Sequence, residues 1–277
     1  MSKLYLYAIF HANLNFSSVP KEYYGQVIQD CYWPLLDIVE DLCVPLGLEF
    51  SAYTLQVIGS HDQDFIKKLR SLWDSEVCEI VGSGYIQSIM PLIPAEVNSA
   101  NLRIGNEIYE DLLGRVPDMA YVNEQVYSSG LPDLYKKAGY KSLIVNWESS
   151  LESSLETHSI YSPHKVLLSD GGFLPIIWHS TLAYRDFQKY IEGEISKSVY
   201  LDSILAHGGS ANNRSFPLYS SDWEVFDFKP WTTQPRGFLG PEVGEMDRIS
   251  DLLKTLRDTE GIEIVSPRSV LSKFTEL

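Results

Sequence analysis

This sequence of 277 residues has few cysteines, few basic side chains and no long apolar run. Its three cysteines form no CxxC pair and have no histidine cluster nearby, so neither a disulfide framework nor a zinc site is indicated. The 22 Lys and Arg residues against 37 Asp and Glu give a formal net charge of -15, which repels nucleic acid and anionic membranes. No segment approaches the roughly 18 apolar residues of a membrane helix. We therefore expect a cytoplasmic protein, without metal or other cofactor, whose partner is neither nucleic acid nor a membrane.

The composition favours a packed globule. Hydrophobic residues make up 44% and aromatic residues 12% of the chain, and the length suits one large α/β domain. The apolar run at residues 4–10 follows Lys3 and resembles the core of a signal peptide. It is only of strand length, however, and no small-residue cleavage pattern follows it. We interpret it as the first buried strand.

Short apolar runs alternate with helical patterns along the chain. Strands are predicted at residues 4–10, 48–57, 77–81, 119–122, 143–146, 173–179, 216–219 and 262–265. Helices are predicted at residues 23–43, 65–73, 95–113, 131–138, 182–195, 200–206, 246–257 and 269–274. The alternation predicts a parallel sheet or barrel with helices outside. Residues 148–170, rich in Ser and Glu, and residues 229–241, with three prolines, are expected to be loops over the barrel mouth.

Polar side chains recur where the predicted strands end: His11, Asn13, Gln87, Glu124, Asn146, His179, Asp222 and Glu224. In a parallel α/β barrel the carboxyl ends of the strands meet on one face, where reacting groups are kept. Glu124 is the leading candidate because it stands where an apolar run stops and a helical pattern begins. Other interpretations stay open at this point. Glu124 could charge the first turn of a helix, Asp222 could be a helix N-cap, and His11 could be a hydrogen-bonded core histidine.

Four segments carry a family resemblance, at residues 11–13, 79–94, 121–127 and 222–226. In them the chain resembles glycoside hydrolase family 57, a group of retaining amylases, glucanotransferases, branching enzymes and α-galactosidases. The first segment is similar to the family's His-x-His motif, with Asn13 replacing the second histidine. Gln87 stands where a Glu or His is usual, and Tyr121 replaces the tryptophan of the Trp-x-x-Glu nucleophile motif. The last segment resembles the Asp-x-Glu-x-Phe motif of the acid/base.

The resemblance implies a fold and a reaction. The fold would be an incomplete (β/α)7 TIM-like barrel, a single domain over residues 1–277 with a short C-terminal helical segment. The reaction would be double displacement on an α-linked glucan or oligosaccharide, by hydrolysis or transfer. Glu124 would be the nucleophile and Asp222 the acid/base, with carboxyls about 5 to 5.5 Å apart. Asp222 would need a raised pKa, which burial or the charge of Glu224 or Glu124 could supply.

The resemblance also suggests which residues hold the sugar. His11, Asn13, Gln87 and His179 would hydrogen-bond its hydroxyls. The aromatic side chains that could stack on sugar faces are Tyr85, Trp147, Trp178, Trp223 and Trp231, and burial in the core is the alternative for each. Asp186 is a second candidate for the acid. It ranks behind Asp222 because Arg185-Asp186 lies on a helical stretch, where an exposed charge pair is the simpler explanation.

Two other functions compete with this one. A polysaccharide deacetylase has a similar barrel but needs a metal held by an Asp and two histidines on a short spacing, and no such spacing follows a strand here. A carbohydrate-binding barrel with reduced turnover is the second alternative, because Asn13 and Gln87 depart from the family pattern.

Overall fold

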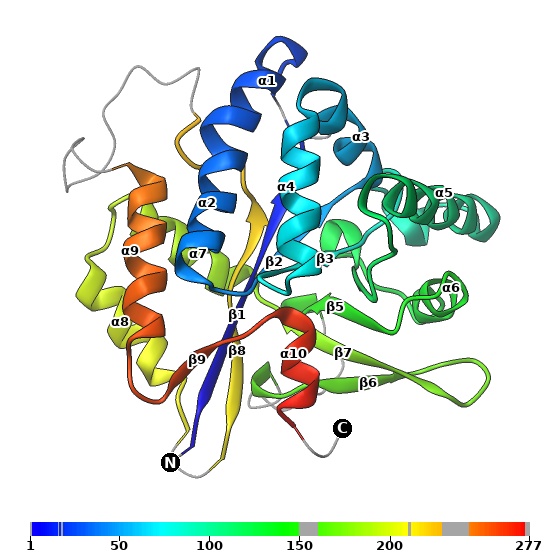
Figure 1. The fold of residues 1–277 in the computed structure, drawn as a ribbon. Helices are drawn as coiled ribbons and strands as arrows, with labels where there is room; N and C mark the ends of the chain where they lie inside the picture. The colour runs from blue at the N-terminus through cyan, green and yellow to red at the C-terminus, as the bar shows by residue number, and fades with distance from the viewer. Residues whose placement is uncertain are drawn as a thin grey trace.

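The computed structural model describes residues 2–15, 17, 19–149, 160–209, 212–228 and 244–274. Seven parallel strands form its centre (Figure 1): β1 (Leu4–Ala12), β2 (Leu46–Phe50), β3 (Cys78–Val81), β4 (Met119–Tyr121), β5 (Ser142–Asn146), β7 (Phe173–His179) and β8 (Arg214–Asp222). Two further strands flank them, β6 (His164–Leu167), antiparallel to β7, and β9 (Ile262–Ile264), parallel to the start of β1.

The seven strands follow one another around an open barrel. Hydrogen bonds join them in the orders β8-β1-β2-β3 and β4-β5-β7, and a parallel bridge between Gly82 and Ala120 connects the two groups. β7 and β8 approach each other but are not paired among the described strands. The barrel is therefore incomplete, as predicted, and opens between β7 and β8.

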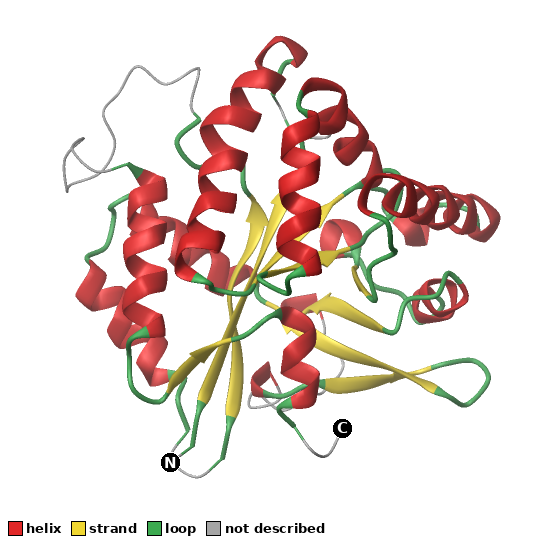
Figure 2. Ribbon diagram, viewed as in Figure 1, coloured by secondary structure: helices red, strands yellow, loops and turns green. Residues whose placement is uncertain are grey.

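Helices cover the outside of the strands (Figures 1 and 2). The α-helices are α1 (Tyr24–Val27), α2 (Trp33–Leu42), α3 (Ala52–His61), α4 (Gln63–Asp74), α5 (Ala95–Leu113), α6 (Leu131–Lys137), α7 (Thr181–Ile191), α8 (Lys197–Ala206), α9 (Glu245–Arg257) and α10 (Pro267–Ser272). The short turns are η1 (Lys21–Tyr23), the π-helical η2 (Ile28–Tyr32), η3 (Met90–Leu92) and η4 (Asn123–Gln125). No helix in the part of the chain that the structure describes is both long and apolar enough to span a bilayer.

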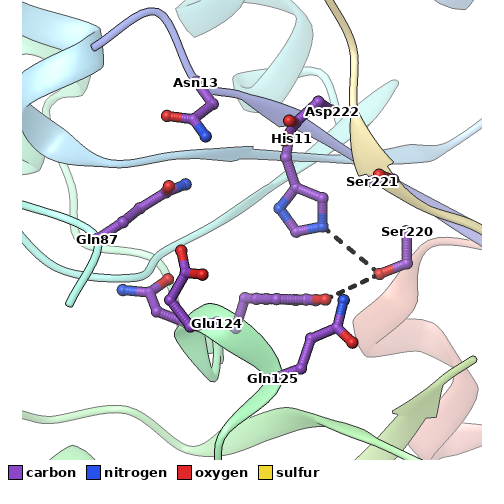
Figure 3. Close-up of a pocket in the computed structure, with 10 residues that line it drawn as sticks. His11, Asn13, Gln87, Glu124, Gln125, Ser220, Ser221 and Asp222 are labelled. Atoms are coloured by element: carbon purple, nitrogen blue, oxygen red, sulfur yellow. Dashed lines mark hydrogen bonds between the residues drawn. The ribbon is translucent and has the colours of Figure 1, made fainter. Parts of the chain in front are cut away.

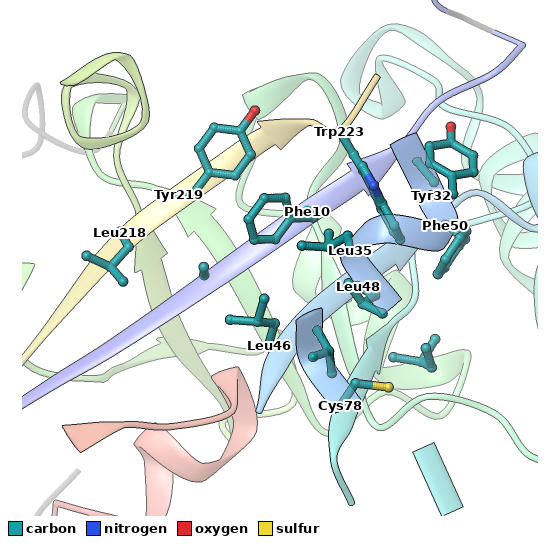
Figure 4. Close-up of a cluster of buried hydrophobic side chains, with 14 of the residues drawn as sticks. Phe10, Tyr32, Leu35, Leu46, Leu48, Phe50, Cys78, Leu218, Tyr219 and Trp223 are labelled. Atoms are coloured by element: carbon teal, nitrogen blue, oxygen red, sulfur yellow. The ribbon is translucent and has the colours of Figure 1, made fainter. Parts of the chain in front are cut away.

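Strand alternation divides the core into two layers. On β1, Phe10 faces outward into the large cluster between the strands and the helices, where Figure 4 shows it beside Trp223 and Tyr219. Tyr7 and Ile9 belong instead to the smaller cluster that fills the barrel, with α10 contributing Val270. His11 continues the inward-facing series beyond Ile9, because successive strand residues point to opposite sides. The packed interior thus ends in a polar layer at the carboxyl end of the barrel.

Two predictions about local structure were wrong. The strand predicted for residues 48–57 ends at Phe50, because the Ser51 side chain accepts a hydrogen bond from the Thr54 N–H and caps α3. The segment 148–170, expected to be a loop, contains β6 and its hairpin with β7. Residues 150–159 of that segment and residues 229–243, with the predicted second loop and Trp231, lie outside the described part of the chain.

Candidate active site

A pocket of about 330 Å³ opens at the carboxyl ends of the strands. It is lined by His11, Asn13, Gln87, Tyr121, Asn123, Glu124, Gln125, Ser220, Ser221 and Asp222. These residues come from β1, the segment after β3, the end of β4 with η4, and β8. In Figure 3 the side chains of Asn13, Gln87 and Glu124 point toward the same space beside the His11 ring. The fold therefore brings together five of the predicted site residues: His11, Asn13, Gln87, Glu124 and Asp222.

A β-bulge in β8 decides that Asp222 faces the pocket. Pro217 pairs with Tyr7 and Tyr219 pairs with Ala8, so Leu218 is the extra residue. Without this insertion the inward positions would continue from Pro217 to Tyr219 and Ser221. With it they shift to Ser220 and Asp222, which lie opposite Ile9 and His11 in the register. The bulge thus places the Asp222 carboxyl, in place of Ser221, at the barrel mouth, and Ser220 in place of the Tyr219 ring one layer below.

Glu124 is held in an unusual backbone conformation. It lies in η4 directly after β4, with φ of 55° and ψ of 15°, and Gln125 also has a positive φ of 58°. A non-glycine residue in the left-handed region costs about 1 to 3 kcal/mol and persists only where the surrounding structure enforces it. The Val122 N–H donates to the Ile144 carbonyl at 3.1 Å, and the Tyr135 hydroxyl donates to the Tyr121 carbonyl at 3.3 Å. These bonds fix the chain just before the turn that exposes the Glu124 carboxyl.

Asp222 has the electrostatics of a proton donor. Partial burial is the largest influence and raises the pKa of its carboxyl, and the negative charges of Glu49 and Glu124 raise that pKa further. A charge on His11 and a hydrogen bond from Asn13 act in the opposite direction. Because burial outweighs them, Asp222 holds its proton at a higher pH than an exposed aspartate.

A chain of buried hydrogen bonds runs along the pocket wall from β2 to β7. His11 Nδ1 lies 2.9 Å from Glu49 Oε2, and His11 Nε2 lies 3.5 Å from Ser220 Oγ. The Ser220 hydroxyl donates to the Tyr121 hydroxyl at 3.2 Å, which in turn lies 3.0 Å from His179 Nε2. His179 is fully buried, and burial together with His11 lowers its pKa well below the ordinary value. It supports Tyr121 from behind and does not line the pocket, where it was predicted to bind sugar.

Glu224 is also buried, two residues after Asp222, but it lies outside the pocket lining. Its Oε1 accepts hydrogen bonds from the Tyr32 hydroxyl and the Asn13 N–H. Burial, followed by the nearby charge of Asp222, raises the pKa of the Glu224 carboxyl to about 8. Its place is therefore behind the segment that carries Asn13, and a direct contact with sugar is not supported.

Of the five aromatic side chains named for stacking on sugars, the four that the structure describes do not line the pocket. Trp223 is fully buried, and its indole N–H donates to the Cys31 carbonyl at 2.9 Å. Trp147 and Trp178 are buried against each other, with ring centroids 5.1 Å apart, on the outward side of β5 and β7. Tyr85 packs on Tyr53, with ring centroids 5.5 Å apart. The predicted stacking role is therefore wrong for Trp147, Trp178 and Trp223, which have no free ring face, and Tyr85 lies outside the lining.

Asp186 is also remote from this chemistry. It lies on α7 and pairs with Lys189 one turn later, at 2.8 Å, with both side chains about half exposed at 49%. It belongs to no part of the pocket lining. The structure therefore supports neither the acid role nor a contact with sugar for Asp186.

Several lining residues were missed from the sequence. Ser220, Ser221, Asn123 and Gln125 are small or neutral polar residues of a kind found in any loop. Glu49, which contacts His11 of the lining, could have been found from the sequence, because it is a charged residue between Leu48 and Phe50 in an apolar strand. Across the described ranges, no group of three or more His, Cys, Asp or Glu side chains is placed to hold a metal ion.

The fold and the pocket together define a class: an open (β/α)7 barrel with two carboxyls, Glu124 and Asp222, at the carboxyl ends of its strands. The model of glycosyl hydrolase family 57 matches residues 9–191, which is more than half of the chain. The chain therefore belongs to glycosyl hydrolase family 57.

Individual relatives are distant and longer. The 4-alpha-glucanotransferase of Thermococcus litoralis is 23% identical over 268 residues, covering 94% of this chain and 37% of the relative. The alpha-amylase of Pyrococcus furiosus is 23% identical over 269 residues, covering 93% and 38%. The crystal structure of the Thermococcus litoralis enzyme has a TM-score of 0.79 at 17% identity, covering 99% of this chain and 41% of that one. This chain thus spans less than two fifths of the length of these two sequence relatives.

Proposed function

We propose that this barrel is a retaining glycoside hydrolase or transglycosidase that acts on an α-linked glucan or oligosaccharide. The observation that carries the proposal is that Glu124 and Asp222, which are far apart in the sequence, line one pocket. Family membership supports it, as do relatives described as a glucanotransferase and an amylase.

Double displacement assigns each carboxyl one task at a time. Glu124 attacks the anomeric carbon while Asp222 gives its proton to the departing glycosidic oxygen, which leaves as a hydroxyl. Asp222, now ionised, removes a proton from water or from an acceptor hydroxyl, whose oxygen displaces Glu124 from the sugar. The raised pKa of Asp222 supports its role as the acid, since the first step needs a protonated carboxyl.

The rest of the lining suits a neutral ligand. Asn13, Gln87, Asn123 and Gln125 offer amide donors and acceptors to sugar hydroxyls, and none of the described residues that line the pocket is a lysine or arginine. The formal charge of -15 also disfavours polyanionic partners. All three cysteines are unpaired, which fits a reducing, cytoplasmic setting.

The test is turnover of 4-nitrophenyl α-glycosides and maltooligosaccharides by the wild type and three variants. We expect Glu124→Gln and Asp222→Asn each to lower kcat by about 10³-fold or more, since either change removes a group that acts in the transition state. Asp186→Asn, an acid outside the pocket, is the matched control and should stay within about twofold of wild type. Unchanged turnover in Glu124→Gln would remove the nucleophile from the scheme.

Covalent trapping tests the same assignment by an independent route. A fluorinated glycosyl fluoride should add one glycosyl unit to the wild type, and peptide mapping should place it on Glu124. A label on another residue, or no label in an enzyme that turns over, would contradict retention through Glu124.

One observation favours a second function, carbohydrate binding without turnover. Asn13 and Gln87 point into the space beside Glu124 (Figure 3), and amides bind hydroxyls but do not transfer protons. For this function, calorimetry would show maltooligosaccharide binding to a wild type that releases no product.

A further inference from the structure

Glu49 is an acidic side chain in the polar layer at the carboxyl end of the barrel, and the scheme above does not use it. It lies on β2 opposite His11 of β1, and its side chain is fully buried. The flanking Leu48 and Phe50 belong to the outer core cluster, so alternation directs Glu49 inward. Burial of a carboxylate without compensation costs several kcal/mol, so this side chain needs a partner.

The partner is His11. The 2.9 Å contact between Glu49 Oε2 and His11 Nδ1 is its ion pair, and no lysine or arginine of the described residues approaches it closely enough for another. Glu49 Oε1 has no hydrogen-bond partner among the described residues. Its charge reaches Asp222 and the buried Tyr121, where it raises the pKa of both groups alongside the larger effect of burial. A positive charge on His11 would balance it.

The proton that each hydrogen bond in this chain needs indicates where the positive charge lies. The Ser220 hydroxyl has one proton and donates it to the Tyr121 oxygen. Toward His11 it can therefore offer only lone pairs, so the contact with His11 Nε2 requires an N–H on that nitrogen. On the other side, a carboxylate accepts only, so His11 Nδ1 also carries a proton. This pattern of donors and acceptors points to an N–H on both ring nitrogens of His11, which is the imidazolium form.

We propose that Glu49 is a positioning residue that holds His11 as an imidazolium with its Nε2–H available to the pocket beside Asp222. The 3.5 Å distance from Nε2 to Ser220 Oγ is long for a hydrogen bond, so this N–H can turn to a ligand oxygen at little cost. The sugar in the reacting position would then meet a charged donor, which is roughly twice as strong as a neutral one. This role rests on the proposed function, whereas the charge on His11 does not.

The charged groups that face His11 favour a positive charge on its ring. Glu49 approaches from β2, Asp222 from β8 and Glu124 from η4, while the Tyr121 ring meets the imidazole edge at 4.3 Å between centroids. His179, from β7, lies beyond Tyr121 and is held neutral by burial. Among the described residues, the charged groups that face His11 are thus carboxyls, with no second cation.

Nuclear magnetic resonance tests the charge without any substrate. The chain has six histidines, so labelling the imidazole nitrogens with ¹⁵N gives few signals, and His11→Asn assigns the one of interest. Near neutral pH we expect two protonated nitrogens on His11 in the wild type and one in Glu49→Gln. A neutral His11 in the wild type, or an imidazolium that persists in Glu49→Gln, would overturn the proposal. The wild-type spectrum decides even if the variant does not fold.

The matched control is Glu79→Gln. Glu79 is another buried glutamate, on the adjacent strand β3, but it lies near the amino-terminal end and pairs with Arg268 on α10. Its replacement should leave the His11 signals unchanged. A change in them equal to that of Glu49→Gln would mean that loss of any buried acid disturbs the site, and would count against positioning.

Kinetics with 4-nitrophenyl α-maltoside test the role in binding and turnover. Because a charged hydrogen bond is lost, Glu49→Gln should lower kcat/KM by about 10- to 100-fold, Glu49→Asp less, and Glu79→Gln by about twofold at most. Full activity in Glu49→Gln with a neutral His11 would contradict the positioning role. If the wild type itself turns nothing over, the proposed function fails while the spectra still report the charge on His11.

Discussion

Replacing Glu224 by glutamine gives a measurable change in how stability depends on pH. The carboxyl is buried, and its pKa is raised to about 8 from an ordinary 4.5. Glutamine has nearly the same shape, keeps the oxygen that accepts from Tyr32 and from the Asn13 N–H, and cannot ionise. The variant therefore removes the titration and preserves the two hydrogen bonds.

The direction of the pH effect on stability depends on whether Glu224 binds its proton more tightly in the folded protein or in the unfolded chain. The folded protein keeps the Glu224 proton to a higher pH than the unfolded chain, so this group's contribution is complete below the unfolded pKa and is lost as pH rises toward 8. From about pH 5 to about pH 7.5, the difference between the folded and unfolded pKa values lowers the wild type's free energy of unfolding by about 3 kcal/mol. Glu224→Gln lacks this loss. Its stability relative to wild type should thus increase by about that amount over the interval.

Urea unfolding followed by tryptophan fluorescence at several pH values measures the free energy of unfolding of both proteins. The other titrating groups are common to both, so they largely cancel in the difference. Parallel pH curves for the wild type and Glu224→Gln would refute the reasoning. A difference that grows toward low pH would show that Glu224 is ionised in the folded protein.

Two further predictions concern packing beside the site. Trp223→Ala removes a fully buried ring that contacts Tyr32 at 4.7 Å between centroids, and it should lower the free energy of unfolding by about 3 to 5 kcal/mol, measured by urea unfolding. Gly105→Ala would place a Cβ 2.8 Å from the Gly84 carbonyl carbon, so it should destabilise by about 1 to 3 kcal/mol despite the better helix propensity of alanine. Gly25→Ala, with no atom within 4 Å of the new Cβ, is its control and should raise the melting temperature slightly. Equal effects of the two glycine changes would contradict the close approach at Gly105.

The order of strands and helices was largely readable from the sequence. Apolar runs such as residues 173–179 and helical patterns such as residues 95–113 coincide with β7 and α5, because these patterns reflect local burial. The prediction of a strand beyond Phe50 was wrong because the apolar residues after Ser51 fit a buried helix as well as a strand. Only the capping side chain of Ser51 marks the start of the helix.

The aromatic residues show what a linear pattern leaves open. Trp178 directly precedes His179 on β7, and alternation sends the two to opposite sides of the strand. His179 faces inward, so Trp178 has to pack outward against Trp147. The sequence marks both as large side chains near a strand end, but which of them faces the barrel depends on register.

The sequence by itself determined that polar and acidic residues follow the strands, and that Glu124 and Asp222 stand at two such ends. That much is local, since each depends only on where an apolar run stops. Tertiary structure decided the rest. The bulge at Leu218 turns Asp222 inward, and the register of β1 with β2 places His11 opposite Glu49. The left-handed turn at Glu124 exposes its carboxyl. These relations join residues far apart in the chain, and their energies arise only when the strands are paired and water is excluded between them.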